Sequence, residues 1–179
     1  MKPNSLQELY VEQLRDLYAA EHQIIRALPK MIEKANSEGL KDALNQHLEV
    51  TKEQATRVEE IFERLGEKAK GEKCKGIAGI ITEGDDLIGD IKDEDVRDAA
   101  IIAAAQRVEH YEMAGYGTAR TYAELLEEDE ASLVLQKTLD EEKEADETLT
   151  RLASEINVNA SMKSAESEER RPSKARRAA

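Results

Sequence analysis

Apolar residues recur every three to four positions over four long stretches of the chain, which is the spacing of one face of an α-helix. The long stretches cover residues 6–35, 38–65, 94–127 and 130–157, and a shorter one covers 76–91. Ser5 and Glu8 have the spacing of a capping box before the first stretch, and Gly66 follows the second. The pattern therefore predicts an all-α chain of four long helices and one short helix.

The connections between these helices indicate how they pack. Tight turns at 36–39 and 127–129 join the first pair and the last pair of long helices, whereas a long connection that contains the short helix separates the two pairs. Two tight turns and one crossover are typical of a ferritin-like four-helix bundle. We predict this bundle, with antiparallel pairs and the additional short helix in the crossover between the second and third long helices.

The apolar period stops at Asn157, and the remaining sequence is polar and basic. Residues 160–179 hold six Lys or Arg and three Glu, a net charge of +3. Such a composition cannot bury enough apolar surface to form a core. We predict a bundle domain over residues 1–158 and a disordered basic C-terminal tail over 159–179. A solvated tail is the simple interpretation, and weak contact with nucleic acid or membrane phosphates is the alternative.

The composition limits which classes of partner the protein can bind and in which cellular compartment it is expected. The chain of 179 residues has 36% charged residues, 3% aromatic residues and a net charge of −13, which disfavours nucleic-acid binding by the folded body. Cys74 is the only cysteine, so no internal disulfide is possible, as expected in a reducing compartment. No apolar run has the length of a signal peptide or membrane span. We expect a cytoplasmic protein without membrane contact.

Carboxylates occupy positions where apolar side chains are expected. Glu112 lies at the centre of the apolar face of the third long helix, with Glu109 on its flank. Glu21 and Glu142 are central on the first and fourth long helices, and Asp146 follows one turn after Glu142. Burying such charges without a partner costs several kcal/mol. Each of these side chains therefore needs a partner or a metal ion.

The second long helix places His47, Thr51 and Gln54 on its apolar face. All these polar residues lie near the middle of their helices, so antiparallel packing would bring them to one level of the bundle. Carboxylates so close together cannot all ionise without cations between them. Oxygen ligands with one imidazole suit iron or manganese. We predict a site for two divalent ions, Fe or Mn, with these candidate ligands: Glu21, His47, Thr51, Gln54, Glu109, Glu112, Glu142 and Asp146.

A structural interpretation competes with the metal site. A chain this acidic places some Glu on apolar faces by chance, and boundary Glu side chains can reach solvent. His47 taken alone is more often a hydrogen-bonded core residue than a ligand. Tyr18 and Tyr111 lie near the candidate ligands in sequence, and core filling is the simpler role for both. Central carboxylates recur on three separate helices, which chance placement does not readily explain, and this recurrence favours the metal site.

The segments DLYAAEHQI, HLEVTKEQ, DAAIIAAAQRVEHYEMAGYGTA and TLDEEKEADETLTRLA resemble the YciF/YciE family of bacterial ferritin-like stress proteins. The resemblance covers about residues 5–157, and its most specific part is AAQRVEHYEMAGYGT. It implies a ferritin-like bundle with an extra helix, a homodimer and a link to stress responses.

More distant ferritin-like and rubrerythrin-like relatives imply a fuller ligand set. Their pattern has Glu-x-x-His on the second helix, where this chain has Thr51 and Gln54, and a His on the fourth, where it has Ala145 or Asp146. Our leading hypothesis is a di-metal carboxylate protein that consumes peroxide or oxygen by ferroxidase, peroxidase or catalase-type chemistry. The alternative is a non-enzymatic helical dimer with a degenerate metal site that acts as a structural or interaction protein.

Overall fold

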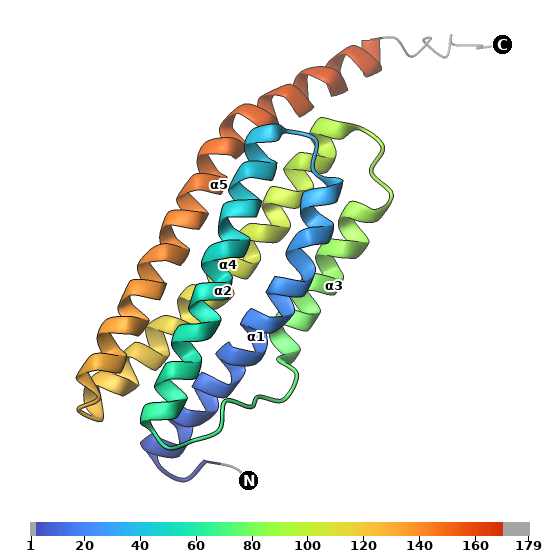
Figure 1. Cartoon of the computed structure of the whole chain (residues 1–179). Coiled ribbons are helices and arrows are strands. Elements are labelled where there is room, and N and C mark those ends of the chain that lie inside the picture. Colours follow the sequence, from blue (N-terminus) through green and yellow to red (C-terminus); the bar gives the residue numbers. More distant parts are fainter. Residues whose placement is uncertain (1–2, 170–179) are drawn as a thin grey trace, which may run out of the picture.

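The computed structural model describes residues 3–169, with side chains described as far as residue 162. Within this part of the chain all regular structure is helical, in five helices (Figure 1). They are α1 (Leu6–Lys34), α2 (Glu38–Arg64), α3 (Lys75–Gly89), α4 (Glu94–Leu125) and α5 (Asp129–Glu169). The all-α prediction is confirmed, and the first four helices begin and end within two residues of the predicted bounds.

Side-chain caps explain where the helices begin. Ser5 Oγ accepts a hydrogen bond from the backbone N–H of Glu8 at 3.1 Å, and Asp93 Oδ1 accepts two at the start of α4. Such acceptors satisfy N–H groups that have no partner within the helix. Gly66, just after α2, has a φ of +66°, a conformation that favours glycine and reverses the chain there.

The helices form two hairpins, α1–α2 and α4–α5, which pack against each other as a four-helix bundle (Figure 1). Helix α3 lies in the crossover between the hairpins and contacts α4 and α1. Helices α1 and α4 approach closely at Gly115, where an added Cβ would come within 2.7 Å of Leu17 Cδ2. The predicted bundle with its additional crossover helix is thus confirmed.

Helix α5 is longer than the sequence pattern predicts. It continues from the predicted end at residue 157 to Glu169 and extends past the other helices (Figure 1). Val158 and Met162 are exposed on this extension. Residues such as Ala, Glu, Lys and Met favour the helix, so a helix already nucleated by packing continues without an apolar face. The domain boundary at 158 remains a prediction, and residues 170–179 of the predicted tail lie outside the described residues.

Two apolar clusters fill the bundle, one toward each end. One contains Ile24, Leu44, Val108 and Leu149, and the other contains Leu14, Val58, Tyr116 and Leu135; each has further members, which in the first cluster include Ile77 and Ile88 of α3. On α2, α4 and α5, the residues between the two clusters include polar side chains that are fully buried. The core is therefore two apolar regions separated by a polar layer.

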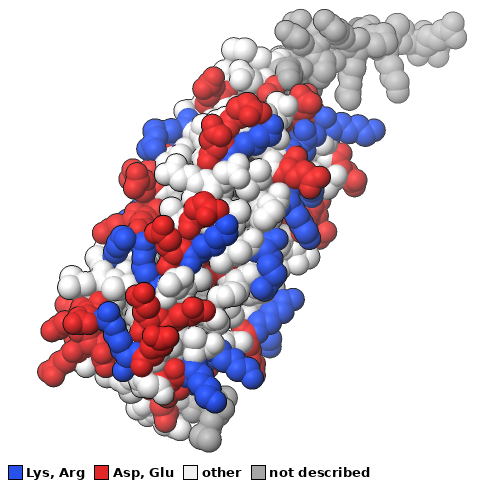
Figure 2. All heavy atoms as spheres, viewed as in Figure 1, with Lys and Arg blue, Asp and Glu red and all other residues white. Residues whose placement is uncertain are grey.

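The outer surface is highly charged. On the face shown in Figure 2, acidic and basic side chains alternate along the helices, and acidic groups gather where α4 turns into α5. The turn itself has the sequence Glu-Glu-Asp-Glu over residues 127–130. Among the residues that the structure describes, no helix combines the length and apolar character that a membrane span requires.

Candidate metal centre

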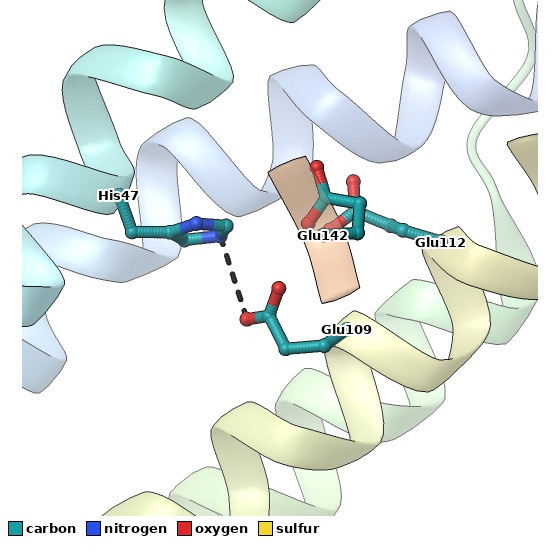
Figure 3. A group of neighbouring side chains, drawn as sticks. All are labelled: His47, Glu109, Glu112 and Glu142. Atoms are coloured by element: carbon teal, nitrogen blue, oxygen red, sulfur yellow. Dashed lines mark ion pairs between the residues drawn. The ribbon is translucent and has the colours of Figure 1, made fainter. Parts of the chain in front are cut away.

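The polar layer between the two apolar clusters brings four potential ligands together. His47 comes from α2, Glu109 and Glu112 from α4, and Glu142 from α5 (Figure 3). Each offers one ligand atom, and these four atoms all lie within 4.8 Å of one another. Glu109 and Glu112 reach the same site because residues three apart share a helix face.

These side chains are almost completely removed from water. Glu112 and Glu142 have no exposed surface, and the side chain of Glu109 retains 3% of its exposure. The side chain of His47 retains 10%, the most of the four, and its Nε2 lies 3.4 Å from Glu109 Oε1. The group therefore combines three buried carboxyls with one imidazole that reaches toward the surface.

Most of the buried polar atoms in this layer lack a hydrogen-bond partner. Both carboxyl oxygens of Glu112 are unpartnered, as are Oε2 of Glu109 and Oε2 of Glu142. His47 Nε2 makes no hydrogen bond either. Each such atom ordinarily costs about 1–3 kcal/mol when it is buried alone. Ligand atoms that face one another without N–H or hydroxyl partners are the arrangement expected of a metal-binding group.

The protonation states follow from burial. Burial raises the pKa of Glu112 well above its ordinary value, and the charges of Glu21, Glu142 and Glu109 raise it further. Burial likewise raises the pKa of Glu109 and brings that of Glu142 to about 7. Burial lowers the pKa of His47 to about 4, so the imidazole is neutral at pH 7. Neutral imidazole is the form that binds metal.

Glu21 from α1 joins the same layer beside this group. It is fully buried, and its pKa is raised first by burial and then by the charge of Glu142. The hydroxyl of Tyr116 donates a hydrogen bond to Glu21 Oε1, while Oε2 has no partner. One oxygen of Glu21 is thus held in place by Tyr116, and the other remains available.

Gln54 reaches the layer as a hydrogen-bond donor. Its Nε2 donates to Glu142 Oε1 and, at 3.3 Å, to Oε2 of Glu141. Arg57 also donates to Glu141, at 3.0 Å to Oε1, so this outer carboxylate is neutralised by a cation. The amide nitrogen therefore occupies one oxygen of Glu142, and only Oε1 of Gln54 is unpartnered.

Two predicted candidates stand apart from the group of four. Thr51 is fully buried, but its hydroxyl donates to the backbone oxygen of His47 at 2.7 Å within its own helix. Asp146 is half-buried and accepts from Gln106 Nε2 at 3.0 Å. Asp146 raises the pKa of Glu109, after burial and Glu142, so it is near the layer without belonging to the group.

Sequence reasoning missed Tyr116, although its position four residues after Glu112 places it on the same helix face. It also pointed to Tyr18 and Tyr111, because both lie close to candidate ligands in the sequence. In the structure, Tyr18 donates to Glu59 at 2.8 Å and Tyr111 donates to Asp16 at 2.6 Å. Neither of these hydroxyls bonds to a member of the layer.

The residues present fit a divalent cation. Three carboxyls and one neutral imidazole supply hard oxygen ligands and a nitrogen, a set compatible with iron or manganese. One carboxyl oxygen each of Glu109, Glu112 and Glu142 lies within 4.8 Å of the others and of a nitrogen of His47, around a small space that an ion would fill. The fold and the layer together define a class of protein: an all-helical bundle with carboxylates and one histidine buried at its centre.

Comparison with known proteins gives the family. Residues 5–162 match a family described as a domain of unknown function, DUF892. Protein YciF of Escherichia coli strain K12 is 42% identical over 154 residues, which cover 86% of this chain and 93% of YciF. The chain belongs to the DUF892 family, which confirms the resemblance found in the sequence.

Solved structures support this assignment. The E. coli stress protein YciF matches with a TM-score of 0.84 at 41% identity, over 88% of this chain and 99% of that one. YcfI of Rhodopseudomonas palustris, whose description proposes a structural role, matches with a TM-score of 0.80 at 46% identity, over 82% and 94%. A protein from Xanthomonas campestris pv. campestris shares the fold at 22% identity, with a TM-score of 0.70 over 89% and 99%.

Proposed function

We propose that this chain is a ferritin-like stress-response protein whose buried layer binds two divalent ions, Fe or Mn, and consumes oxidants. The observation that carries the proposal is the convergence of unpartnered ligand atoms from α2, α4 and α5. A purely structural layer would be expected to satisfy its buried polar atoms within the protein. Similarity to the stress protein YciF supports the physiological setting.

The two positions would differ in their affinity for the ion. His47, Glu109, Glu112 and Glu142 would hold the first ion, because they offer four atoms within one small space. Oε2 of Glu21, together with the other carboxyls of the layer, would hold the second ion. Gln54 weakens this second position, since its amide hydrogens already occupy Glu142 Oε1 and bring no negative charge.

Iron or manganese, when bound, supplies electron exchange with peroxide or oxygen, as in ferroxidase, peroxidase or catalase-type reactions. The chain's own residues contribute the surroundings. Tyr116 fixes the orientation of Glu21 through its hydroxyl, and the two apolar clusters keep bulk water out of the layer. Electrostatic interactions inside such a dry layer are stronger than in water.

We also propose a homodimer in the cytoplasm. A reducing compartment suits Cys74, the only cysteine of the chain, whose thiol is unpaired and buried. Size-exclusion chromatography with light scattering measures the oligomeric state directly, and a monomeric mass would contradict the dimer.

A non-enzymatic structural protein is the second candidate. Thr51 and Gln54 stand where more distant relatives supply Glu and His, in that order, and the description of the R. palustris relative proposes a structural role. On this alternative the layer is a degenerate metal site, and the protein acts through its surface.

Thermal melting with and without metal separates the two candidates. Added Mn(II) or anaerobic Fe(II) should stabilise the wild type by RT ln(1 + [L]/Kd), about 2.7 kcal/mol at a hundredfold excess over Kd. Glu112→Gln removes a ligand and should abolish this stabilisation. Without metal, the same change relieves repulsion and should leave the protein equally stable or more stable.

Metal analysis of the purified protein provides the control for this experiment. The di-metal proposal is wrong if the wild type carries no Fe or Mn and its melting temperature does not respond to either ion. The structural alternative would then be favoured.

A further inference from the structure

We propose that a surface hollow between α2 and α5 is the port through which a divalent cation reaches the buried layer. This inference rests on the proposed metal centre and adds a route to it. The hollow has a volume of about 340 Å³. Its lining comes from the middle of both helices: Gln46, His47, Val50, Glu141, Glu144, Ala145, Thr148 and Arg151.

His47 connects the hollow to the ligands. Its side chain lines the hollow from one side and retains 10% of its exposure there. Its Nε2 lies at the other side, 3.4 Å from Glu109 Oε1 and without a hydrogen bond. In Figure 3 the imidazole extends from α2 toward Glu109. His47 therefore belongs both to the lining of the hollow and to the buried ligand group.

Other approaches to the layer are covered or bridged. The seam between α4 and α5 is bridged by Gln106, which donates to Asp146 at 3.0 Å and to Thr150 at 2.9 Å. Helix α3 packs on α4 and α1 and covers that side of the bundle. The apolar clusters close both ends, so the α2–α5 seam beside His47 offers the most direct path.

The seam between α2 and α5 is itself closed on one side of His47 and open on the other. Toward the start of α5, Arg57 bridges to Thr138 at 3.2 Å and to Glu141, and Gln54 bridges to Glu141 and Glu142. Further along α5 the lining residues Ala145 and Thr148 are small, and Arg151 beyond them donates to Thr148 Oγ1 at 2.7 Å. The opening thus lies between the Arg57 bridge and Arg151, where the side chains are small.

One carboxylate at the rim can attract a cation. Glu144 is exposed beside the hollow, whereas Glu141 is paired with Arg57 and Arg151 adds a positive charge to the lining. Carboxylates around a concave site raise the local concentration of cations and their rate of arrival. An attracted ion would pass from Glu144 toward His47 and then to the buried group.

Two pairs of variants test the port by the rate of cation uptake. Ala145→Trp fills the hollow, and Ala103→Trp makes the same change at an exposed position on α4 outside it. Glu144→Lys reverses charge at the rim, and Glu147→Lys does so at an exposed position on α5 outside the hollow. The probe is Co(II), whose visible absorption changes when nitrogen and oxygen ligands bind it, mixed with metal-free protein in a stopped-flow instrument.

Close-packed side chains leave no path for an ion, so Ala145→Trp should slow uptake by about tenfold or more. Glu144→Lys should slow it by roughly threefold to tenfold at low salt, with the difference shrinking as ionic strength rises. Both variants should reach the wild-type stoichiometry and final thermal stabilisation, because no ligand is changed. The two control variants should take up Co(II) at the wild-type rate.

The outcomes distinguish the port from the metal centre. Wild-type binding of Co(II) with unchanged rates in Ala145→Trp and Glu144→Lys would overturn the port and leave the metal centre standing. Absence of Co(II) binding by the wild type would overturn both. If Ala145→Trp fails to fold, the comparison of Glu144→Lys with Glu147→Lys still decides, since both positions are exposed.

Discussion

Asp98 and Glu112 are two carboxylates on α4 that are equally buried but differ in their partners. Asp98 is 1% exposed, and its two oxygens accept backbone N–H groups of Asn36 and Ser37 at 2.8 and 2.7 Å. Glu112 is 0% exposed, no N–H or hydroxyl group donates to either of its oxygens, and its carboxyl lies against that of Glu21. Asp98 holds the turn between α1 and α2, whereas Glu112 contributes nothing comparable to the fold. Burial alone therefore does not distinguish a structural carboxylate from a candidate metal ligand, whereas the hydrogen-bond partners of the two carboxylates do differ.

The largest effect should come from pH acting on the metal-free layer. Burial raises the pKa of Glu21, Glu109, Glu112 and Glu142 in the folded protein, the last to about 7. Groups whose pKa is raised by folding contribute stability at pH values below the unfolded pKa, near 4.5, and lose it as pH rises through the folded value. The metal-free protein should therefore become less stable from pH 6.5 to 8.5, by on the order of 1 kcal/mol per pH unit for each retained proton.

Urea denaturation of the metal-free protein at several pH values measures this slope. The pH range lies above 6.5 because the lowered pKa of His47 acts in the opposite direction below that value. Glu112→Gln should flatten the slope, and a variant at Asp98 should not. A stability that increases with pH in metal-free wild type would contradict the proposed protonation of the layer.

Asp98→Asn should give the largest effect of a single substitution. An amide at this position keeps one acceptor but turns an NH₂ group toward a backbone N–H, so at least one buried donor loses its partner. We expect a loss of about 2–3 kcal/mol, which lowers the melting temperature by several degrees in a chain of this size. Stabilisation by added Mn(II) should persist in this variant, in contrast to Glu112→Gln.

Gln54→Glu should strengthen the proposed second ion position. The change removes the amide donor to Glu142 and adds a carboxylate to the layer. Without metal, the added repulsion should cost about 1–2 kcal/mol, and with Mn(II) the number of tightly bound ions should rise toward two. Gln106→Glu, a matched change at the more exposed α4–α5 seam, should leave the stoichiometry unaltered. Isothermal titration calorimetry with metal analysis measures both quantities.

Truncation after residue 158 should have the smallest effect. It removes no residue that belongs to either apolar cluster, since the last member is Ile156 in one and Leu139 in the other. The melting temperature should stay within about two degrees of the full chain. A larger decrease would show that the end of α5 packs on another surface.

The helices could be predicted from sequence because their apolar faces are regular, and Glu112 was identifiable because it interrupts such a face. The end of α5 could not be predicted from sequence, since residues 157–169 have no apolar period and continue the helix through local propensity. The role of Thr51 could not be predicted either, because its hydroxyl donates a hydrogen bond to the backbone oxygen of His47. Asp98 escaped notice because its partners come from a turn some sixty residues earlier in the chain.

The division of the core into two apolar clusters has a consequence for cooperativity. In the metal-free protein, the layer that separates them holds buried carboxyls in place of apolar contacts, so we expect each end of the bundle to open without the other. An ion bound by α2, α4 and α5 at once would act as a crosslink between the two ends. Hydrogen exchange in the two halves should then proceed at separate rates without metal and at one common, slower rate with it.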